Sequence, residues 1–253
     1  MYYFSSAFHL AASGLFSSVL LGCRDSTRGQ QAVADIQAQG KGKIAPTTEI
    51  KHLPLTVGDA ASHEQFRKAV EEQYGKLDCL VNNAGFAFKG ADPTPFAQQC
   101  KPTIDINFRG TVDLTETLLP LLRKGTDARI VNVASMSGHL SQLRSAELRN
   151  QFTSQTLTMD ELRELVDQFE TDVLAGKHTE KGWGNSNYGM SKLALHCSHK
   201  GNGARGGEKW NQGELLLPWL LRHGHDQPPR FQTAQRGCSE RSATSDDGEM
   251  SIG

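Results

Sequence analysis

The stretch Leu77-Asp78-Cys79-Leu80-Val81-Asn82-Asn83-Ala84-Gly85 decides the fold of this chain. Its apolar part, Leu77 to Val81, has the length and composition of a strand that is buried on both faces, and the polar residues after it indicate a loop. A second run of this kind, Arg-Ile-Val-Asn-Val-Ala, occupies residues 129–134. Strands of this type are typical of a parallel sheet that helices cover on both faces.

Helical patterns alternate with strand patterns over the first half of the chain. Residues 17–22 form a further candidate strand, preceded by part of a helix. Two capping boxes, Thr27 with Gln30 and Ser62 with Gln65, predict the starts of two helices. The alternation of the two patterns predicts an α/β fold.

The composition excludes several classes of protein. The 253 residues are enough for one large domain or two small ones. A net charge of −1 and a pI of about 6.8 exclude a basic nucleic-acid arm or a polyanionic tail as the main feature. Five cysteines are scattered without a CxxC pair, which argues against a disulfide framework and against a structural zinc site. This pattern suits a reducing compartment, and we expect a cytoplasmic protein.

The first 23 residues contain no Lys, Arg, Asp or Glu, and residues 19–23, Val-Leu-Leu-Gly-Cys, resemble a lipoprotein cleavage box. However, no positive region precedes the box, and serines together with His9 interrupt the apolar run. A helix followed by a buried strand is therefore preferred over a targeting or anchoring segment, which stays open as the alternative.

Residues 140–182 have the pattern of a helical insertion. Thr158 and Glu161 form a third capping box, and Gly176 suits the end of the helix that follows. The apolar stripe of this helix consists of Leu162, Leu165, Val166, Phe169 and Val173. Such a stripe predicts packing on the sheet domain rather than a binding groove.

The composition changes again after residue 197. Residues 197–253 contain no Val, no Tyr and one Ile, so they lack the β-branched runs that buried strands need. We therefore expect residues 198–253 to form a tail outside the domain, with a composition that leans towards disorder.

Tyr188 and Lys192 are the first candidates for chemistry. On a helix, residues four positions apart share one face. An ammonium group beside a phenol favours the phenolate and lowers the pKa of the phenol. Tyr188 could then exchange a proton with a carbonyl oxygen near neutral pH. Taken alone, the pair is a weak signal, because this spacing more often belongs to two solvated surface residues.

Further polar residues are predicted at the edge of the sheet where open parallel sheets bind ligands. The residues Asn82-Asn83-Ala84-Gly85 and the hydroxyl of Ser135 each follow a strand, and Asn107 lies on the helix between them. Arg24 and Arg28 follow an earlier strand, and their guanidinium groups suit a phosphate.

These motifs, in this order, resemble the short-chain dehydrogenase/reductase superfamily. Residues 80–89 (LVNNAGFAFK), residues 91–96 (ADPTPF) and a long insert ending in Gly182-Trp183 resemble its NADPH-dependent carbonyl reductase branch. The resemblance covers roughly residues 11–195. It implies a Rossmann-type doubly wound parallel sheet, NADPH as cofactor, and reduction of an aldehyde or ketone to an alcohol.

The resemblance also implies a role for each candidate residue. Tyr188 is the general acid, and Lys192 lowers its pKa and holds the nicotinamide ribose. Ser135 orients the substrate carbonyl, and Asn107 holds a water that links Lys192 to solvent; the alternative for Asn107 is an ordinary polar residue of a helix. Cofactor contacts are implied for Arg24, Arg28, Asn83, Ala84, Gly85, Tyr188 and Lys192. The two arginines select NADPH over NADH, although Arg28 also fits a solvated residue of a first helical turn.

The chain departs from the family at both ends. A first strand with a glycine-rich turn of the TGxxxGIG kind, which would cradle a pyrophosphate, is not found before Arg24. We therefore expect the chain to begin inside the first helix of the family. Thr56 stands where the family usually has an Asp that contacts adenine. By resemblance, a buried strand that ends in Pro-Gly should follow Lys192, and none is found. Our hypothesis is that a frameshift near residues 195–197 produced the sequence after it. His196, His199, His223 and His225 are then accidental, and no metal site is predicted.

Residues 1–197 are thus expected to form one domain with residues 140–182 inserted, in which the first strand and the late strands of the sheet are missing. We expect the substrate to be a small carbonyl compound. No nucleic-acid or membrane partner is expected for the protein. By resemblance, the insert covers a surface that other members use to form tetramers, which predicts a monomer. We expect impaired activity for the chain as written. A catalytically dead family member and a gene-model product without function are the alternatives.

Overall fold

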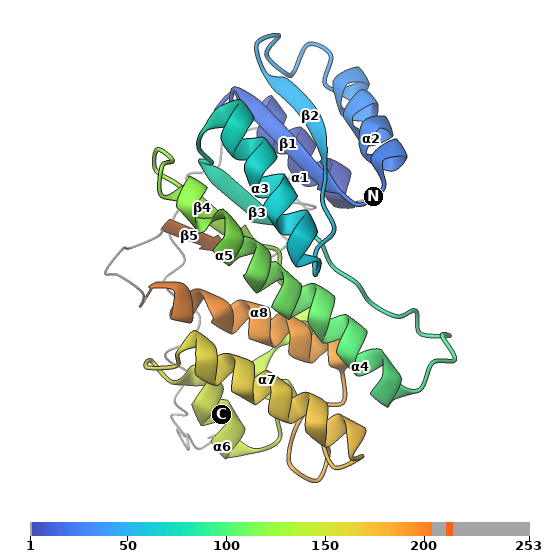
Figure 1. Ribbon diagram of the computed structural model, residues 1–253. Coiled ribbons are helices and arrows are strands. Elements are labelled where there is room, and N and C mark those ends of the chain that lie inside the picture. Colours follow the sequence, from blue (N-terminus) through green and yellow to red (C-terminus); the bar gives the residue numbers. More distant parts are fainter. Residues whose placement is uncertain (1, 204–210, 215–253) are drawn as a thin grey trace, which may run out of the picture.

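The computed structural model describes the backbone of residues 2–203 and 211–214 and the side chains of residues 6–198. Its first half alternates helices and strands as the sequence predicts (Figure 1). The elements are α1 (Tyr2–Ala12), β1 (Ser18–Cys23), α2 (Ser26–Gln39), β2 (Glu49–Pro54), α3 (Ala60–Tyr74) and β3 (Cys79–Asn82). The predicted strand at residues 17–22, preceded by a helix, is confirmed. Among the described residues, no helix is long and apolar enough to cross a membrane.

The second half is mostly helical. Its elements are α4 (Phe96–Ile104), the π-helical turn η1 (Asp105–Arg109), α5 (Gly110–Leu122), β4 (Arg129–Asn132), two short 3₁₀ turns η2 (Met136–Gly138) and η3 (Leu140–Gln142), α6 (Ala146–Thr153), α7 (Met159–Leu174), α8 (Asn187–Gly203) and β5 (Asn211–Glu214). Residues 96–122 form a continuous helical rod made of α4, η1 and α5, and the rod leads to β4. The insertion and the helix that carries Tyr188 follow β4.

The strands are parallel, as predicted, but they form two separate sheets. One sheet has the order β1-β2 and the other has the order β3-β4-β5. Leu20 of β1 and Leu80 of β3 nevertheless pack against the same buried cluster, which α3 and α5 supply. The hydrogen-bonded sheet is therefore interrupted between β1 and β3. The helices α3 and α5 nevertheless form one layer that packs on strands of both sheets.

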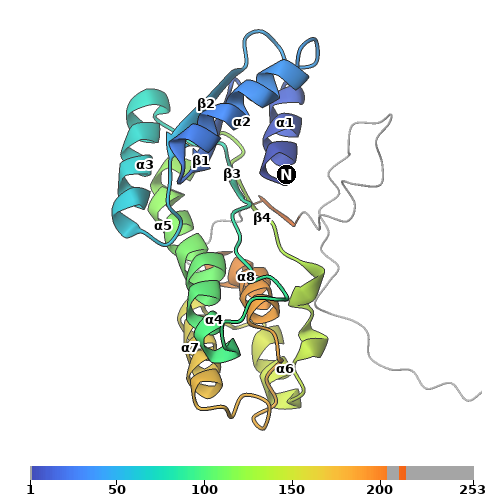
Figure 2. The ribbon, with the colours of Figure 1, turned by 90° about the vertical axis from the view of Figure 1, so that its right-hand side faces the viewer.

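Helices cover both faces of the β1–β2 pair. Figure 2 shows α1 and α2 on one side and α3 on the other. Val19 and Ile50 of the two strands pack with Ala11 of α1 and Ile36 of α2. This is the doubly wound arrangement that the strand composition predicts.

The helix starts test the capping predictions. The box of Thr158 with Glu161 is confirmed, because the Thr158 side chain accepts from the Glu161 amide and the Glu161 carboxylate accepts from the Thr158 amide. The other two boxes are wrong. Asp25 caps α2 and Asp59 caps α3, each by accepting backbone N–H groups of the first turn. An ionised carboxylate is a stronger acceptor than a hydroxyl and interacts favourably with the helix dipole.

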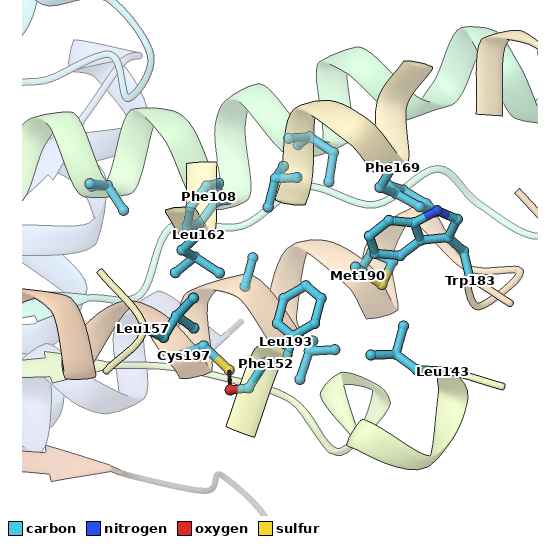
Figure 3. Close-up of a cluster of buried hydrophobic side chains, with 14 of the residues drawn as sticks. Phe108, Leu143, Phe152, Leu157, Leu162, Phe169, Trp183, Met190, Leu193 and Cys197 are labelled. Atoms are coloured by element: carbon cyan, nitrogen blue, oxygen red, sulfur yellow. Dashed lines mark hydrogen bonds between the residues drawn. The ribbon is translucent and has the colours of Figure 1, made fainter. Parts of the chain in front are cut away.

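The insertion packs on the domain as predicted. The stripe of α7 enters a large cluster of buried side chains together with Phe108, Phe152 and Trp183 (Figure 3). Trp183 is 2% exposed, and its indole N–H donates to the buried carboxylate of Asp172 at 2.8 Å. The apolar face of α7 is therefore core rather than a groove.

One late strand is present, against the expectation that residues after 197 supply none. Residues Asn211–Glu214 pair with β4 in parallel, with Arg129 opposite Asn211 and Asn132 opposite Glu214. A ladder forms between main-chain groups, so a short strand at the end of a sheet can do without β-branched side chains. The expectations for the rest of the tail, including the histidines at 199, 223 and 225 and the shifted frame, lie outside the residues whose side chains are described.

Candidate active site

Tyr188 and Lys192 lie on one face of the first turns of α8. The ammonium nitrogen of Lys192 is 5.8 Å from the centroid of the Tyr188 ring, within the range of a cation–π interaction. Gly189 N–H donates to the Ser186 hydroxyl, which caps this end of the helix. The helical spacing thus brings the two predicted side chains together.

Lys192 is a buried cation. It is 3% exposed, and its ammonium donates to the Val133 carbonyl, at the end of β4, at 2.9 Å. Burial lowers the pKa of Lys192 to about 8. Among the ion pairs of the described side chains, none involves Lys192. Its remaining N–H donors can therefore serve the oxygen atoms of a ligand.

Asn107 connects the helical rod to the loop after β3 and to α8. It is fully buried within the π-helical turn η1. Its side-chain oxygen accepts from the Phe86 amide at 2.6 Å, and its side-chain nitrogen donates to the Phe86 carbonyl at 2.8 Å and to the Ser191 hydroxyl at 3.0 Å. The loop that contains Asn83, Ala84 and Gly85 is thereby tied to the helix of Tyr188.

Ser135 follows β4 at the start of η2. Its hydroxyl accepts from the Ser137 amide at 3.2 Å. Gly138, at the end of this turn, approaches α8 so closely that an added Cβ would lie 2.9 Å from the Lys192 carbonyl carbon. Since the turn rests on α8 at Lys192, the Ser135 hydroxyl is held beside the helix of Tyr188.

Gly85 lies where the loop passes this group of residues. A Cβ at this position would lie 3.5 Å from the Lys192 ammonium and 3.7 Å from the Asn107 side-chain oxygen. The structure therefore gathers Tyr188, Lys192, Asn107 and Ser135 with the loop of residues 83–85. The sequence placed residues 82–85 and Ser135 at one edge of the sheet, and the structure brings the helical pair Tyr188 and Lys192 to them.

Two further contacts were not predicted. The Ser191 hydroxyl donates to the Tyr188 carbonyl and accepts from Asn107, so it fixes the amide of Asn107 against α8. The Asn82 amide donates to Asn132 on the neighbouring strand and to Thr115 on α5. The register of Asn82 opposite Asn132 could have indicated the second contact, but nothing local marks Ser191.

Arg24 and Arg28 lie apart from this buried group, after β1 and in the first turn of α2. Both are exposed, and the Arg28 guanidinium pairs only loosely with Asp25, at 3.5 Å. Guanidinium groups in such a position can take a phosphate.

Two separate groups of residues have the chemistry to hold parts of a dinucleotide cofactor. Lys192 offers buried donors for ribose hydroxyls, and Arg24 and Arg28 offer cations for a phosphate. For the pyrophosphate between them, residues 2–23 provide only Gly14 and Gly22, and Gly14 has no neighbouring atom within 4 Å of an added Cβ. The described residues before β1 thus contain no glycine-rich turn. Nor do the described residues contain a group of three His, Cys, Asp or Glu that could hold a metal ion.

Comparisons with known proteins show the family to which the chain belongs. A family model described as short chain dehydrogenase matches residues 5–146. Carbonyl reductase [NADPH] 1 of Homo sapiens is 40% identical over 205 residues, which are 80% of this chain and 71% of that protein. The protein of the same name from Pongo abelii is 42% identical over 183 residues, 72% of this chain and 63% of that one.

Solved structures show the same fold. Menthone neomenthol reductase from Mentha piperita superposes with a TM-score of 0.66 at 26% identity, over 78% of each chain. Salutaridine reductase from Papaver somniferum gives a TM-score of 0.68 at 23% identity, over 80% of this chain and 77% of that one.

Proposed function

Because this chain belongs to the short chain dehydrogenase family, we propose that it is an oxidoreductase of the carbonyl reductase type, which reduces an aldehyde or ketone to an alcohol with NADPH. The observation that carries the proposal is the grouping of Tyr188, Lys192, Ser135 and Asn107 around the loop of residues 83–85. The identity of 40% to a carbonyl reductase of Homo sapiens supports the choice of substrate and cofactor.

The residues of the chain provide orientation and a proton. When bound, NADPH supplies the hydride that reduces the carbonyl carbon. The Tyr188 hydroxyl donates its proton to the carbonyl oxygen as the C–O bond becomes that of an alcohol. The Ser135 hydroxyl donates a hydrogen bond to the same oxygen and so orients the carbonyl.

Lys192 assists the proton transfer from Tyr188. Its ammonium lies over the Tyr188 ring and stabilises negative charge on the phenolate oxygen that forms when the proton leaves. Its other donors hold the nicotinamide ribose. Burial lowers the pKa of Lys192 to about 8, so the side chain still carries its charge at neutral pH.

Asn107 acts on Tyr188 and Lys192 indirectly, through the Phe86 backbone and the Ser191 hydroxyl. The two polar atoms of its amide already have partners on Phe86 and Ser191. We therefore assign Asn107 first to the positioning of the loop and of α8. A water that links Lys192 to solvent, held near Asn107, completes the path by which Tyr188 regains its proton.

The cofactor is held at two further places in this proposal. Arg24 and Arg28 take the 2′-phosphate and so favour NADPH over NADH. Asn83, Ala84 and Gly85 line the nicotinamide end, where Gly85 leaves room beside the Lys192 ammonium. The domain extends over residues 1–197, with residues 140–182 inserted. Of the residues after 197, Asn211–Glu214 add a strand to its sheet beside β4.

We further propose a monomer in the cytoplasm. In Figure 1, α7 runs alongside α4 and α8, and its apolar side chains are buried against them. The face of α4 and α8 that α7 covers is therefore not free for contacts with another subunit. Cys23, Cys79, Cys100 and Cys197 are free thiols, which suits a reducing compartment.

The test is to incubate the purified 253-residue protein with NADPH and a panel of aldehydes and ketones. We expect carbonyl-dependent oxidation of NADPH that is slow because the cofactor binds weakly, with one alcohol formed per NADPH consumed. If the protein binds NADPH but oxidises none with any carbonyl, the alternative of a catalytically inactive family member replaces the proposal. Light scattering that gives a dimer or tetramer would contradict the monomer.

A further inference from the structure

The π-helical turn that carries Asn107 is closed by a network of ion pairs. Asp105 and Arg109 are the first and last residues of the turn, and the Arg109 guanidinium binds the Asp105 carboxylate at 2.6 Å. The same guanidinium binds two carboxylates of α7, Asp167 at 2.5 Å and Glu170 at 2.7 Å. One side chain therefore joins the two ends of the turn to the insertion helix.

This network is only partly open to solvent. The side chains of Arg109 and Glu170 are 24% and 13% exposed. The Asp105 carboxylate also binds Lys101, and although burial acts to raise its pKa, its bonds to Lys101 and Arg109 leave that pKa below its usual value. Charged hydrogen bonds in such a setting are stronger than those between fully exposed groups.

The geometry of the turn matters for Asn107. A π-helical turn contains one residue more than the α-helix around it; such turns are rare and frequently lie at functional sites. If the turn relaxed to a regular α-helix, the residues beyond the change would rotate by about 100° around the helix axis. Asn107 would then lose its bonds to Phe86 and Ser191. The turn must therefore be held in place for the active-site loop and α8 to stay joined.

We propose that Arg109 is a positioning residue for the active site: by clamping the π-helical turn to α7, it holds Asn107 on Phe86 and Ser191. The insertion thereby takes part in the construction of the active site as well as in the packing of the core. The consequence for catalysis rests on the proposed function, whereas the effect on Asn107 does not.

The chain offers a matched control in Arg163. This residue also links α7 to the helical rod through two carboxylates, Asp113 at 3.0 Å and Glu116 at 3.3 Å, and it is 30% exposed. Its partners belong to α5, beyond the π-helical turn. Loss of Arg163 thus removes a similar tie without touching the turn.

The experiment compares Arg109→Met with Arg163→Met in the full chain. Hydrogen exchange of the Phe86 amide, which donates to Asn107, is measured together with kcat, KM and Tm. For Arg109→Met we expect exchange at Phe86 about tenfold faster and kcat lower by about 10- to 100-fold, with a much smaller change in KM. Arg163→Met should lower Tm to a similar extent but leave Phe86 exchange and kcat as in the unmodified protein.

Two further variants cover the case in which Arg109→Met does not fold. Arg109→Lys, which can keep only part of the network, should give an intermediate effect. The double variant Asp167→Asn with Glu170→Gln should reproduce the exchange at Phe86 while leaving Arg109 and Asp105 paired. Equal Phe86 protection in the Arg109 and Arg163 variants overturns the proposal. If the unmodified chain shows no reductase activity, the proposed function fails, and the exchange measurements still decide the role of Arg109.

Discussion

The helical half of the molecule and the β1–β2 half hold their site residues in different ways. Around α4, α7 and α8, Asn107 and Lys192 are buried and bound to the backbone of other elements. Beside β1, Arg24 and Arg28 are exposed and have at most a loose ion pair. In the proposed function, the residues of proton transfer are therefore preorganised by the fold, whereas the two arginines proposed to select the cofactor are exposed side chains with few contacts.

The largest difference between the two halves is expected in cofactor binding. The sequence before β1 lacks a glycine-rich turn, which gives two or three hydrogen bonds to a pyrophosphate. Such bonds are worth roughly 1.5–3 kcal/mol each, so we expect NADPH to bind about 10²- to 10⁴-fold more weakly than to a version with a strand and such a turn added before β1. Cofactor titration of both versions measures this, and equal affinities would contradict it.

The general acid should be needed for turnover but not for cofactor binding. Tyr188→Phe removes only the hydroxyl, so we expect kcat to fall about 10²- to 10⁴-fold while the Kd for NADPH stays nearly the same. Steady-state kinetics and cofactor titration check the two parts. Most of the activity remaining in the variant would mean that another group donates the proton.

The packed core of the helical half can be tested by a cavity. Trp183→Ala removes a buried ring and leaves the Asp172 carboxylate without the indole donor. We expect the free energy of unfolding to fall by about 3–5 kcal/mol. Denaturant unfolding measures the change. Leu174→Ala on the exposed side of α7 is the control and should have little effect, because Leu174 is 64% exposed.

The pH dependence should report Lys192. Its pKa is lowered to about 8, so the ammonium is present below pH 8 and is lost as the pH rises above it. We expect kcat/KM for NADPH to be level below pH 8 and to fall above it by up to about tenfold per pH unit. Rate measurements between pH 6 and 10 test this, with Lys192→Met as the variant that should lack the decline around pH 8. A decline that begins only near pH 10 would show that Lys192 keeps its ordinary pKa.

The smallest effect is expected at the exposed arginines. Arg24→Ala combined with Arg28→Ala should narrow the preference for NADPH over NADH. Because each exposed ion pair is worth roughly 0.2–1 kcal/mol, the ratio of the two affinities should change between a fewfold and about thirtyfold. Arg163→Ala serves as a control for the loss of a guanidinium group elsewhere on the surface. An unchanged ratio would leave both arginines as ordinary solvated residues.

The sequence predicted the elements well but not how every one of them is joined. The strands predicted at residues 17–22, 77–81 and 129–134 and the stripe of α7 were recognised because apolar period and run length are local signals. The structure places these strands at Ser18–Cys23, Cys79–Asn82 and Arg129–Asn132. The capping boxes predicted the starts of α2 and α3 too late, at Thr27 and Ser62. The residues that cap these helices, Asp25 and Asp59, are not part of a capping box. The strand at Asn211–Glu214 was missed because its ladder is made by main-chain groups that no side chain reveals.

The sequence by itself determined the identity and spacing of the candidate chemical groups, because Tyr188 and Lys192 must share a face wherever that segment is helical. Only the tertiary structure decided their surroundings. The burial that lowers the pKa of Lys192, the π-helical turn that aims Asn107 at Phe86, and the reach of Arg109 to α7 all join residues that are far apart in the chain. The tertiary structure also decided that the sheet is interrupted between β1 and β3. Such contacts depend on which elements meet in space, and a local pattern carries no record of that.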